Sequence, residues 1–281
     1  MALILFSIIL FMNGCVDWNI HFQFPTTTAQ TTISTLPTLI DGTLTVLDED
    51  YATFSSYHSV TYDLTDIDEY NDILFSTRDK IKRTNVQVIT TISRVFPFST
   101  IIDSSLSGSG VIFKADATHY YVLTNQHVID DNGKTATYEI YTFDSETPSV
   151  GTLVASDEGL DLAVLKFAKG SITDVVITDI TARVFRKFNQ GELVLAVGNP
   201  LSVVNNVTFG EFLSLQTINN ATFKVIYHNA TIHEGSSGGA LVDIDGLFLG
   251  INTWGSNDSE DQAFAIPNYI VYMFLINNGL I

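Results

Sequence analysis

Short apolar runs separated by turn-forming residues dominate the chain from residue 86 onward. These runs predict β-strands over residues 86–92, 110–114, 120–124, 137–143, 162–167, 193–197, 223–227, 241–242 and 247–252. Turn signals separate them, notably at 131–133 and 243–246, where Asp, Asn and Gly gather. Many short strands at close spacing predict an all-β fold, either a sandwich or barrels.

Two segments instead have apolar residues at helical spacing. Between Asp66 and Arg83 the acidic residues gather at the start and the basic residues at the end, which complements a helix dipole. The stretch from Asn268 to Asn278 has the same apolar spacing and predicts a closing helix. The β-prone pieces between residues 41 and 62 match neither pattern well enough to be placed.

Composition excludes several classes of protein. Hydrophobic residues make up 46% of the 281 residues, which is enough for a core and too much for a wholly disordered chain. Acidic residues number 31 against 13 basic ones, and the net charge of -18 repels nucleic acid and anionic membranes. Cys15 is the only cysteine, so an internal disulfide and a cysteine-based metal site are excluded.

The N-terminus is typical of an export signal. Residues 3–12 form an apolar run that is too short to span a bilayer but fits a signal-peptide core, and Gly14-Cys15 follows it. A small residue before a cysteine resembles a bacterial lipoprotein signal, in which Cys15 is lipidated. Plain secretion and a buried N-terminal strand are the alternatives. The Thr-rich segment 25–37, with Pro at each end, predicts an exposed tether.

These patterns predict three parts of the chain. Residues 1–15 form a signal or lipoprotein-type segment, residues 16–65 a Thr-rich tether with an unplaced remainder, and residues 66–281 a single catalytic domain. The expected location is outside the cytoplasm, with a lipid anchor at Cys15 on the outer face of a bacterial cell membrane. Secretion is the second choice.

The segment Gly235-Ser236-Ser237-Gly238-Gly239 contains a serine between glycines. Glycines allow the backbone to turn so that two N–H groups converge on one oxyanion. The segment also satisfies G-x-S-x-G, the nucleophile elbow of α/β hydrolases, in which the histidine follows the serine. All six histidines precede Ser237, and they are His21, His58, His119, His127, His228 and His233. The α/β-hydrolase reading therefore fails.

A His, Asp, Ser order is available instead. His127 lies where a strand ends in a polar turn, and Asp161 leads into an apolar strand. A serine hydroxyl needs a neighbouring base to become a nucleophile, and that base needs a carboxylate to orient it. We expect Ser237 to be the nucleophile, His127 the base and Asp161 the orienting acid. Asp157 and Asp174 are alternatives for Asp161.

The order and context of these residues resemble the protease domain of the HtrA/Deg family of trypsin-like serine peptidases. The matching segments occur in the family's order, and they are 108–112, 123–129, 161–166, 194–200, 235–241, 250–253 and 264–267. The resemblance implies two six-stranded antiparallel β-barrels of the trypsin-like type, with a short N-terminal helix and a C-terminal helix. It also implies an oxyanion hole made by the amides of Gly235 and Ser237, and no PDZ domain is expected to follow.

Two positions depart from the family pattern. The family has an Asn-Pro pair before the active-site glycine, where this chain has His233-Glu234, and an upstream Asp of the family corresponds to Asn229. These differences leave open whether the oxyanion loop is preformed. His228 and His233 form a pair without a clear third ligand, so no metal site is expected. No cofactor is expected either.

The resemblance also places the substrate pocket. Thr231 occupies the floor of the S1 pocket, and Asn252, Thr253 and Trp254 its wall strand. A floor without an acid predicts small or medium uncharged P1 residues rather than Arg or Lys. The expected partners are protein or peptide substrates, which such clefts bind as an added strand. The alternative is a noncatalytic surface-binding protein on a trypsin-like scaffold.

Overall fold

The computed structural model describes residues 38–40, 43–57, 66–131, 133–143, 145–200, 204–219, 221–255 and 262–281. The expected signal segment, the lipidation of Cys15 and the Thr-rich tether all concern residues before 38, outside the described residues. Among the helices that the structure describes, none is both long and apolar enough to span a membrane.

The first β-barrel closes through six antiparallel strands. They are β4 (Asn85–Phe96), β5 (Ser99–Ala115), β6 (His119–Thr124), β7 (Thr135–Tyr141), β8 (Ser149–Asp157) and β9 (Leu162–Ala168), in the spatial order β4-β5-β6-β9-β8-β7. Alternate residues of these strands point inward, and Val88, Val122 and Leu165 are fully buried.

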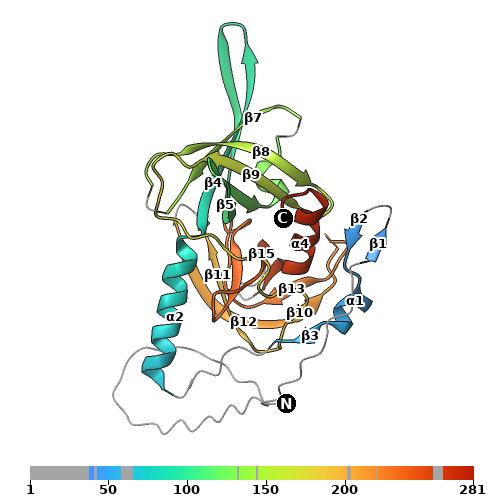
Figure 1. Cartoon of the computed structure of the whole chain (residues 1–281). Coiled ribbons are helices and arrows are strands. Elements are labelled where there is room, and N and C mark those ends of the chain that lie inside the picture. Colours follow the sequence, from blue (N-terminus) through green and yellow to red (C-terminus); the bar gives the residue numbers. More distant parts are fainter. Residues whose placement is uncertain are drawn as a thin grey trace.

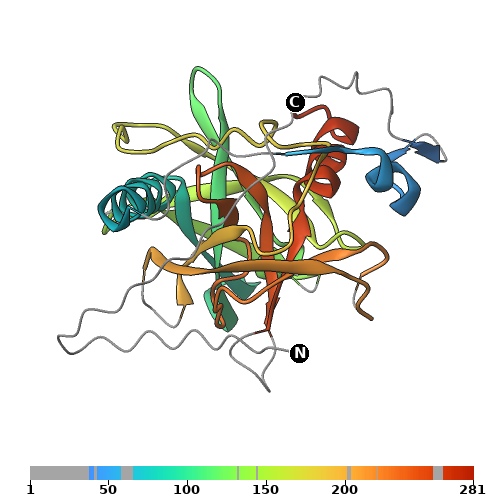
Figure 2. The same ribbon diagram turned by 90° about the horizontal axis from the view of Figure 1, so that it is seen from below.

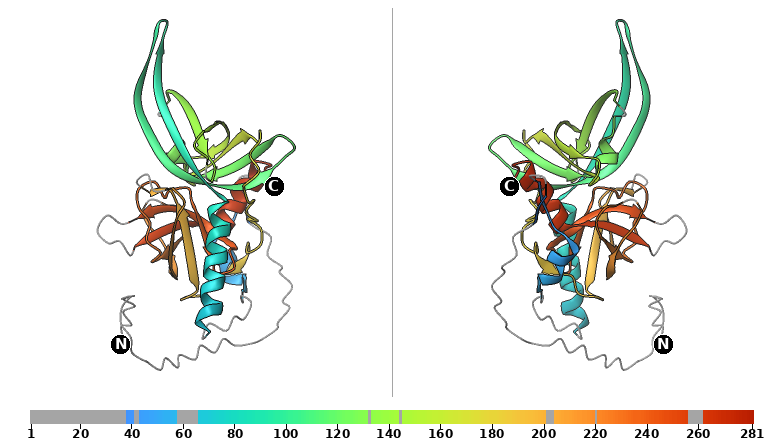
Figure 3. Two further views of the ribbon diagram at one scale, coloured as in Figure 1. Left: turned by 90° about the vertical axis from the view of Figure 1, so that its left-hand side faces the viewer. Right: turned by 90° about the vertical axis from the view of Figure 1, so that its right-hand side faces the viewer.

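The second barrel has the same strand order. Its strands are β11 (Leu193–Gly198), β12 (Asn206–Gln216), β13 (Val225–His228), β14 (Ala240–Asp243), β15 (Phe248–Gly255) and β16 (Ala263–Pro267), in the order β11-β12-β13-β16-β15-β14. The two barrels stack on one another (Figure 3). The expected pair of six-stranded antiparallel barrels is therefore confirmed.

Both predicted helices are present. Helix α2 (Ile67–Lys82) begins at the N-cap Asp66, whose carboxylate accepts the backbone N–H groups of Asp68 at 3.0 Å and Glu69 at 3.2 Å. It lies along β11 and β12 (Figure 1). The closing helix α4 (Asn268–Asn277) is apolar on nearly all sides because it packs against β15 and β16 on one side and the N-terminal segment on the other.

The N-terminal segment that the sequence pattern did not place docks on the second barrel. It comprises β1 (Thr38–Ile40), β2 (Thr43–Thr45), α1 (Asp48–Thr53) and β3 (Ser55–Ser56), and β3 pairs in parallel with β10 (Arg186–Lys187). The aromatic rings of Tyr51 and Phe54 lie 5.5 and 5.7 Å from that of Tyr269 on α4. Figure 2 shows this segment beside α4. Aromatic burial, rather than local periodicity, positions it.

Strands β8, β12 and β16 were not predicted as strands. Most residues of β8 and β12 are exposed or only half buried, although both strands belong to the walls of their closed barrels. Their sequences therefore lack the apolar runs that identified the other strands. Strands β4 and β5 also extend well beyond the predicted segments, as a hairpin that projects from the first barrel and carries a fully exposed Phe98 near its tip (Figure 1).

Candidate active site

Each predicted catalytic residue lies at the end of a secondary-structure element, near the junction of the barrels. His127 lies in the short helix α3 (Gln126–Ile129), directly after β6. Asp161 directly precedes β9, and Ser237 lies in the loop before β14. The first barrel therefore contributes the histidine and the aspartate, and the second contributes the serine.

The imidazole of His127 pairs with the carboxylate of Asp161. His127 Nδ1 lies 2.8 Å from Asp161 Oδ2 and 3.0 Å from Oδ1, and the backbone N–H of His127 donates to Oδ1 at 3.0 Å. The side chain of Asp161 is only 14% exposed, whereas that of His127 is 46% exposed. The carboxylate therefore holds one edge of the ring, and the other edge is available to a reacting group.

The hydroxyl of Ser237 makes its hydrogen bond with Thr253 rather than with His127. Ser237 Oγ donates to the carbonyl oxygen of Thr253 at 3.0 Å, and no hydrogen bond joins Ser237 to His127 among the described residues. In free enzymes such catalytic hydrogen bonds are often long or absent and form only with substrate.

Hydrogen bonds hold three consecutive peptide groups around Ser237. The carbonyl of Gly235 accepts from Ser109 Oγ at 2.7 Å, and the next N–H, of Ser236, donates to His233 O at 2.9 Å. The carbonyl of Ser236 accepts from Gly239 N at 3.0 Å, and that of Ser237 from Ser109 N at 2.8 Å. The turn that carries Ser237, the predicted nucleophile, is thus held by hydrogen bonds on both sides.

The N–H groups of Gly235 and Ser237 make no hydrogen bond within the described residues. Gly235 has a φ of +95°, a conformation that glycine adopts without strain, and a Cβ there would lie 2.5 Å from Asn199 O. Two unused donors in one tight turn are the arrangement that an oxyanion hole requires. Neither end of the Glu234–Gly235 peptide is held by a hydrogen bond among these residues.

Ser109 contacts this turn, although its local sequence predicts no role for it. Its hydroxyl donates to Gly235 O and accepts from the backbone N–H of Asn199 at 2.8 Å and from Asn199 Nδ2 at 3.1 Å. The side chain is fully buried. Its position inside a matched segment, 108–112, was the one available signal, because the contacts join residues about ninety positions or more apart.

The residues predicted to form the S1 pocket occupy different environments. Thr231 is half buried, and its carbonyl accepts from Thr208 Oγ1 at 2.8 Å. Asn252 is fully buried, and its side chain donates to Ala240 O at 2.9 Å. Thr253 and Trp254 continue β15 beyond its last pairing with β14. A Cβ built on Gly255 would lie 3.6 Å from Ile232 Cγ1, so these two residues face each other across a narrow gap.

The other candidates are engaged elsewhere. Asp157 accepts the backbone N–H of Leu160 at 2.9 Å, and Asp174 pairs with Arg83. His228 is buried inside the second barrel, and burial lowers its pKa to about 3. The backbone N–H of His233 donates to Ser236 Oγ at 3.3 Å. No group of three or more His, Cys, Asp or Glu that could hold a metal occurs among the residues that the structure describes.

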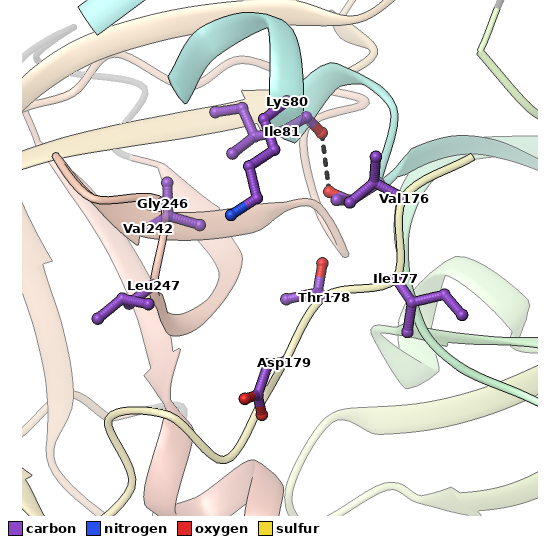
Figure 4. A pocket seen from close by; sticks show the side chains of 10 residues that line it. Lys80, Ile81, Val176, Ile177, Thr178, Asp179, Val242, Gly246 and Leu247 are labelled. Carbon is purple, nitrogen blue, oxygen red and sulfur yellow. Dashed lines mark hydrogen bonds between the residues drawn. The ribbon is translucent and has the colours of Figure 1, made fainter. Parts of the chain in front are cut away.

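A small cavity of about 100 Å³ lies away from these residues, among α2, the segment between the barrels and the β14–β15 turn (Figure 4). Its polar lining comes from Lys80, Thr84, Thr178 and Asp179, and part of its apolar lining from Ile81 and Val242. None of the predicted catalytic residues lines it, so we do not consider it part of the catalytic site.

Comparisons with known proteins place the chain in a family. Residues 108–251 match the trypsin-like peptidase domain. The chain is 34% identical over 171 residues to the serine protease Do-like HtrB of Bacillus subtilis, covering 57% of this chain and 36% of that protein. It is 34% identical over 169 residues to the probable periplasmic serine protease do/HhoA-like of Haemophilus influenzae, covering 57% and 34%.

A solved structure shares the fold. The serine endoprotease from Yersinia pestis superimposes with a TM-score of 0.56 at 31% identity, over 74% of this chain and 66% of that one. The chain spans well under half the length of the curated relatives it matches. On the family match, the relatives and the paired barrels together, the chain belongs to the trypsin-like peptidase family, with HtrA/Do-like serine proteases as its homologues.

Proposed function

We propose that this protein is a serine endopeptidase that hydrolyses peptide bonds through Ser237, His127 and Asp161. The observation that carries the proposal is the double contact of Asp161 with His127, at the ring nitrogen and at the backbone N–H. The turn that bears Ser237 adds two unused amide donors, those of Gly235 and of Ser237 itself. Together these groups supply the parts of a nucleophile, base and oxyanion-hole arrangement.

The reaction begins when Ser237 Oγ leaves the Thr253 carbonyl and turns toward His127. Oγ attacks the carbonyl carbon of the scissile bond, and its proton passes to His127 Nε2. The amides of Gly235 and Ser237 stabilise the oxyanion of the tetrahedral intermediate. His127 then gives the proton to the leaving amine, and an acyl group remains on Ser237. A water molecule then gives a proton to His127 and attacks the acyl carbon. The bond between that carbon and Ser237 Oγ breaks, His127 returns the proton to Oγ, and the carboxylic acid leaves.

An extended substrate segment is the form that this site accepts. Residues 254–255 of β15 pair with β16 on one edge, and their other edge has no strand partner among the described residues. A peptide added to this edge pairs by backbone hydrogen bonds, without regard to its side chains. We therefore propose extended or unfolded protein segments as substrates.

We further propose a preference for small or medium uncharged P1 residues, such as Val, Ala or Leu. Thr231 provides no charge at the floor, and Ile232 faces Gly255 across a narrow gap. A peptide library with every residue at P1 tests this preference, and Ile232→Ala should broaden it toward Phe. A wild-type profile dominated by Arg or Lys would contradict it.

Labelling with a fluorophosphonate probe tests the reaction itself. We expect the wild-type protein to react covalently and Ser237→Ala not to react, with His127→Ala reacting at least about 10³-fold more slowly. Ser76→Ala is the control, because this serine is exposed on α2, away from the turn that carries Ser237, and its loss should leave labelling unchanged. Absence of labelling in a folded wild-type protein would favour the alternative, a noncatalytic binding protein on this scaffold.

We also propose that the protein acts outside the cytoplasm, anchored by a lipid on Cys15. The support is the short apolar run before Gly14-Cys15. Growth of an expressing bacterium with an alkyne fatty acid should label the wild-type protein in the membrane fraction and not Cys15→Ser. Labelling of neither, with the wild-type protein in the medium, would indicate plain secretion.

A further inference from the structure

Asn125 lies fully buried two residues before His127, and its local sequence predicts no part for it in the candidate site. Its amide Nδ2 donates to the backbone carbonyl of Asp161 at 2.8 Å and to Thr253 Oγ1 at 3.0 Å. Both hydrogens of one NH2 group are therefore used. A carbonyl oxygen only accepts, and Thr253 Oγ1 already donates to Ile251 O at 3.0 Å, so the amide orientation of Asn125 is chemically determined.

The hydrogen bond from Asn125 to Asp161 holds a residue whose backbone is strained. Asp161 has a φ of +53°, which a residue with a Cβ seldom adopts. Segment 125–127 holds both the backbone and the side chain of Asp161. Asn125 donates to its backbone carbonyl, and His127 contacts its carboxylate through the backbone N–H and Nδ1. Strain of this kind persists only where neighbouring contacts overdetermine the conformation.

The hydrogen bond from Asn125 to Thr253 joins the first barrel to the second. Thr253 belongs to β15, and its own backbone carbonyl is the acceptor of Ser237 Oγ. Asn125 thus connects the His127–Asp161 pair of the first barrel to the strand that positions the serine of the second barrel. These two segments lie 128 positions apart in the sequence.

We propose that Asn125 is a positioning residue with two effects. Its contact with the Asp161 carbonyl fixes the position of Asp161 relative to His127, and its contact with Thr253 fixes the position of this pair relative to Ser237. This inference rests on the proposed peptidase function. Loss of the Asn125 amide releases the carbonyl of Asp161 and lets its carboxylate move away from the imidazole. A misplacement of about 1 Å among reacting groups lowers the rate about 10²-fold.

The rate of fluorophosphonate labelling tests the proposal. In Asn125→Ala we expect this rate to fall about 10²-fold. Asn268→Ala is the matched control, because Asn268, on α4, is equally buried and donates to Phe248 O at 3.1 Å. Asn268→Ala should lose stability but keep the wild-type labelling rate.

Substitutions at Thr253 decide the matter even if Asn125→Ala does not fold. Thr253→Val removes the acceptor of one Asn125 hydrogen and should also lower the labelling rate. Thr253→Ser keeps the hydroxyl and should keep the rate near that of the wild-type protein. The proposal is overturned if the wild-type protein is labelled and Asn125→Ala reacts as fast as it does, or if Thr253→Val reacts as fast as Thr253→Ser. No labelling of the wild-type protein would instead refute the peptidase function.

Discussion

Ser109 Oγ donates a hydrogen bond of 2.7 Å to the carbonyl oxygen of Gly235, across 126 positions of the sequence. The bond orients the peptide that follows Gly235 and so steadies the turn that leads to Ser237. The backbone N–H of Ser109 also donates to Ser237 O, so this one residue of the first barrel holds both ends of the turn.

Replacement of Ser109 should therefore weaken catalysis more than folding. In Ser109→Ala the carbonyl of Gly235 and the Asn199 N–H lose a partner, and the freed turn no longer presents its amides together. We expect the labelling rate to fall about 10²-fold, the usual effect of losing one oxyanion donor. Thr77→Val is the control, because Thr77 is also buried and its hydroxyl donates to Ile244 O at 2.6 Å. Equal rates in the two variants would contradict this role.

Gly235→Ala should abolish labelling because the added Cβ meets Asn199 O at 2.5 Å and must displace the loop. Gly170→Ala provides a control with a similar backbone penalty: Gly170 also has a positive φ, of +50°, but no atom lies within 4 Å of its Cβ position. We expect this variant to lose only about 1 kcal/mol of stability. Urea unfolding and probe labelling of both proteins separate strain from loss of the oxyanion site.

Arg183 should be important for folding rather than for catalysis. Its guanidinium is fully buried, 2.9 Å from the carboxylate of Asp243 and 3.2 Å from that of Glu192. Burial raises the pKa of both carboxyl groups, and Arg183 opposes that shift. Arg183→Ala leaves two carboxylates buried without their cation, which should lower the free energy of unfolding by about 3–5 kcal/mol.

Urea unfolding measures this loss, and Arg78→Ala is the control because Arg78 pairs with Asp79 at the surface. The control should change stability by less than about 1 kcal/mol. Similar losses of unfolding free energy in both variants would contradict the prediction that the buried Arg183 cluster stabilises the fold more than a surface ion pair does.

His228 should make the protein less stable in acid. Burial lowers its pKa from 6.5 to about 3, although Asn252 and the Ala230 backbone favour the protonated ring. Between these two values the unfolded chain takes up a proton that the folded protein does not bind. Stability therefore falls as the pH decreases through this window, by up to about 1.4 kcal/mol per pH unit from this group.

In His228→Leu this contribution disappears, because leucine does not titrate. Urea unfolding at several pH values between 7 and 4 should give a shallower decrease of stability for the variant than for the wild-type protein. The comparison uses only the slope of unfolding free energy against pH. A change of packing at position 228 shifts stability equally at every pH, so it does not affect this slope. Parallel curves would refute the prediction.

Local pattern was enough to predict much of this protein. The helix at residues 67–82 follows from its Asp66 cap and apolar spacing, and the buried strands follow from their apolar runs. The order of His127, Asp161 and Ser237 indicated the trypsin-like class, because each of the three lies in a short contiguous segment that can be recognised in the sequence. Strands β8 and β12 lack such runs, since most of their residues are exposed or only half buried.

Tertiary structure alone decided how the site is held together. The carbonyl that Ser237 contacts, the two amides it leaves unused, and the roles of Ser109 and Asn125 depend on hydrogen bonds between distant segments of the two barrels. The docking of residues 46–57 on α4 likewise depends on aromatic partners more than 200 positions away. A sequence determines which side chains are available and which local structure they favour. Their meeting across a barrel interface depends on the closure of both sheets, which no local pattern encodes.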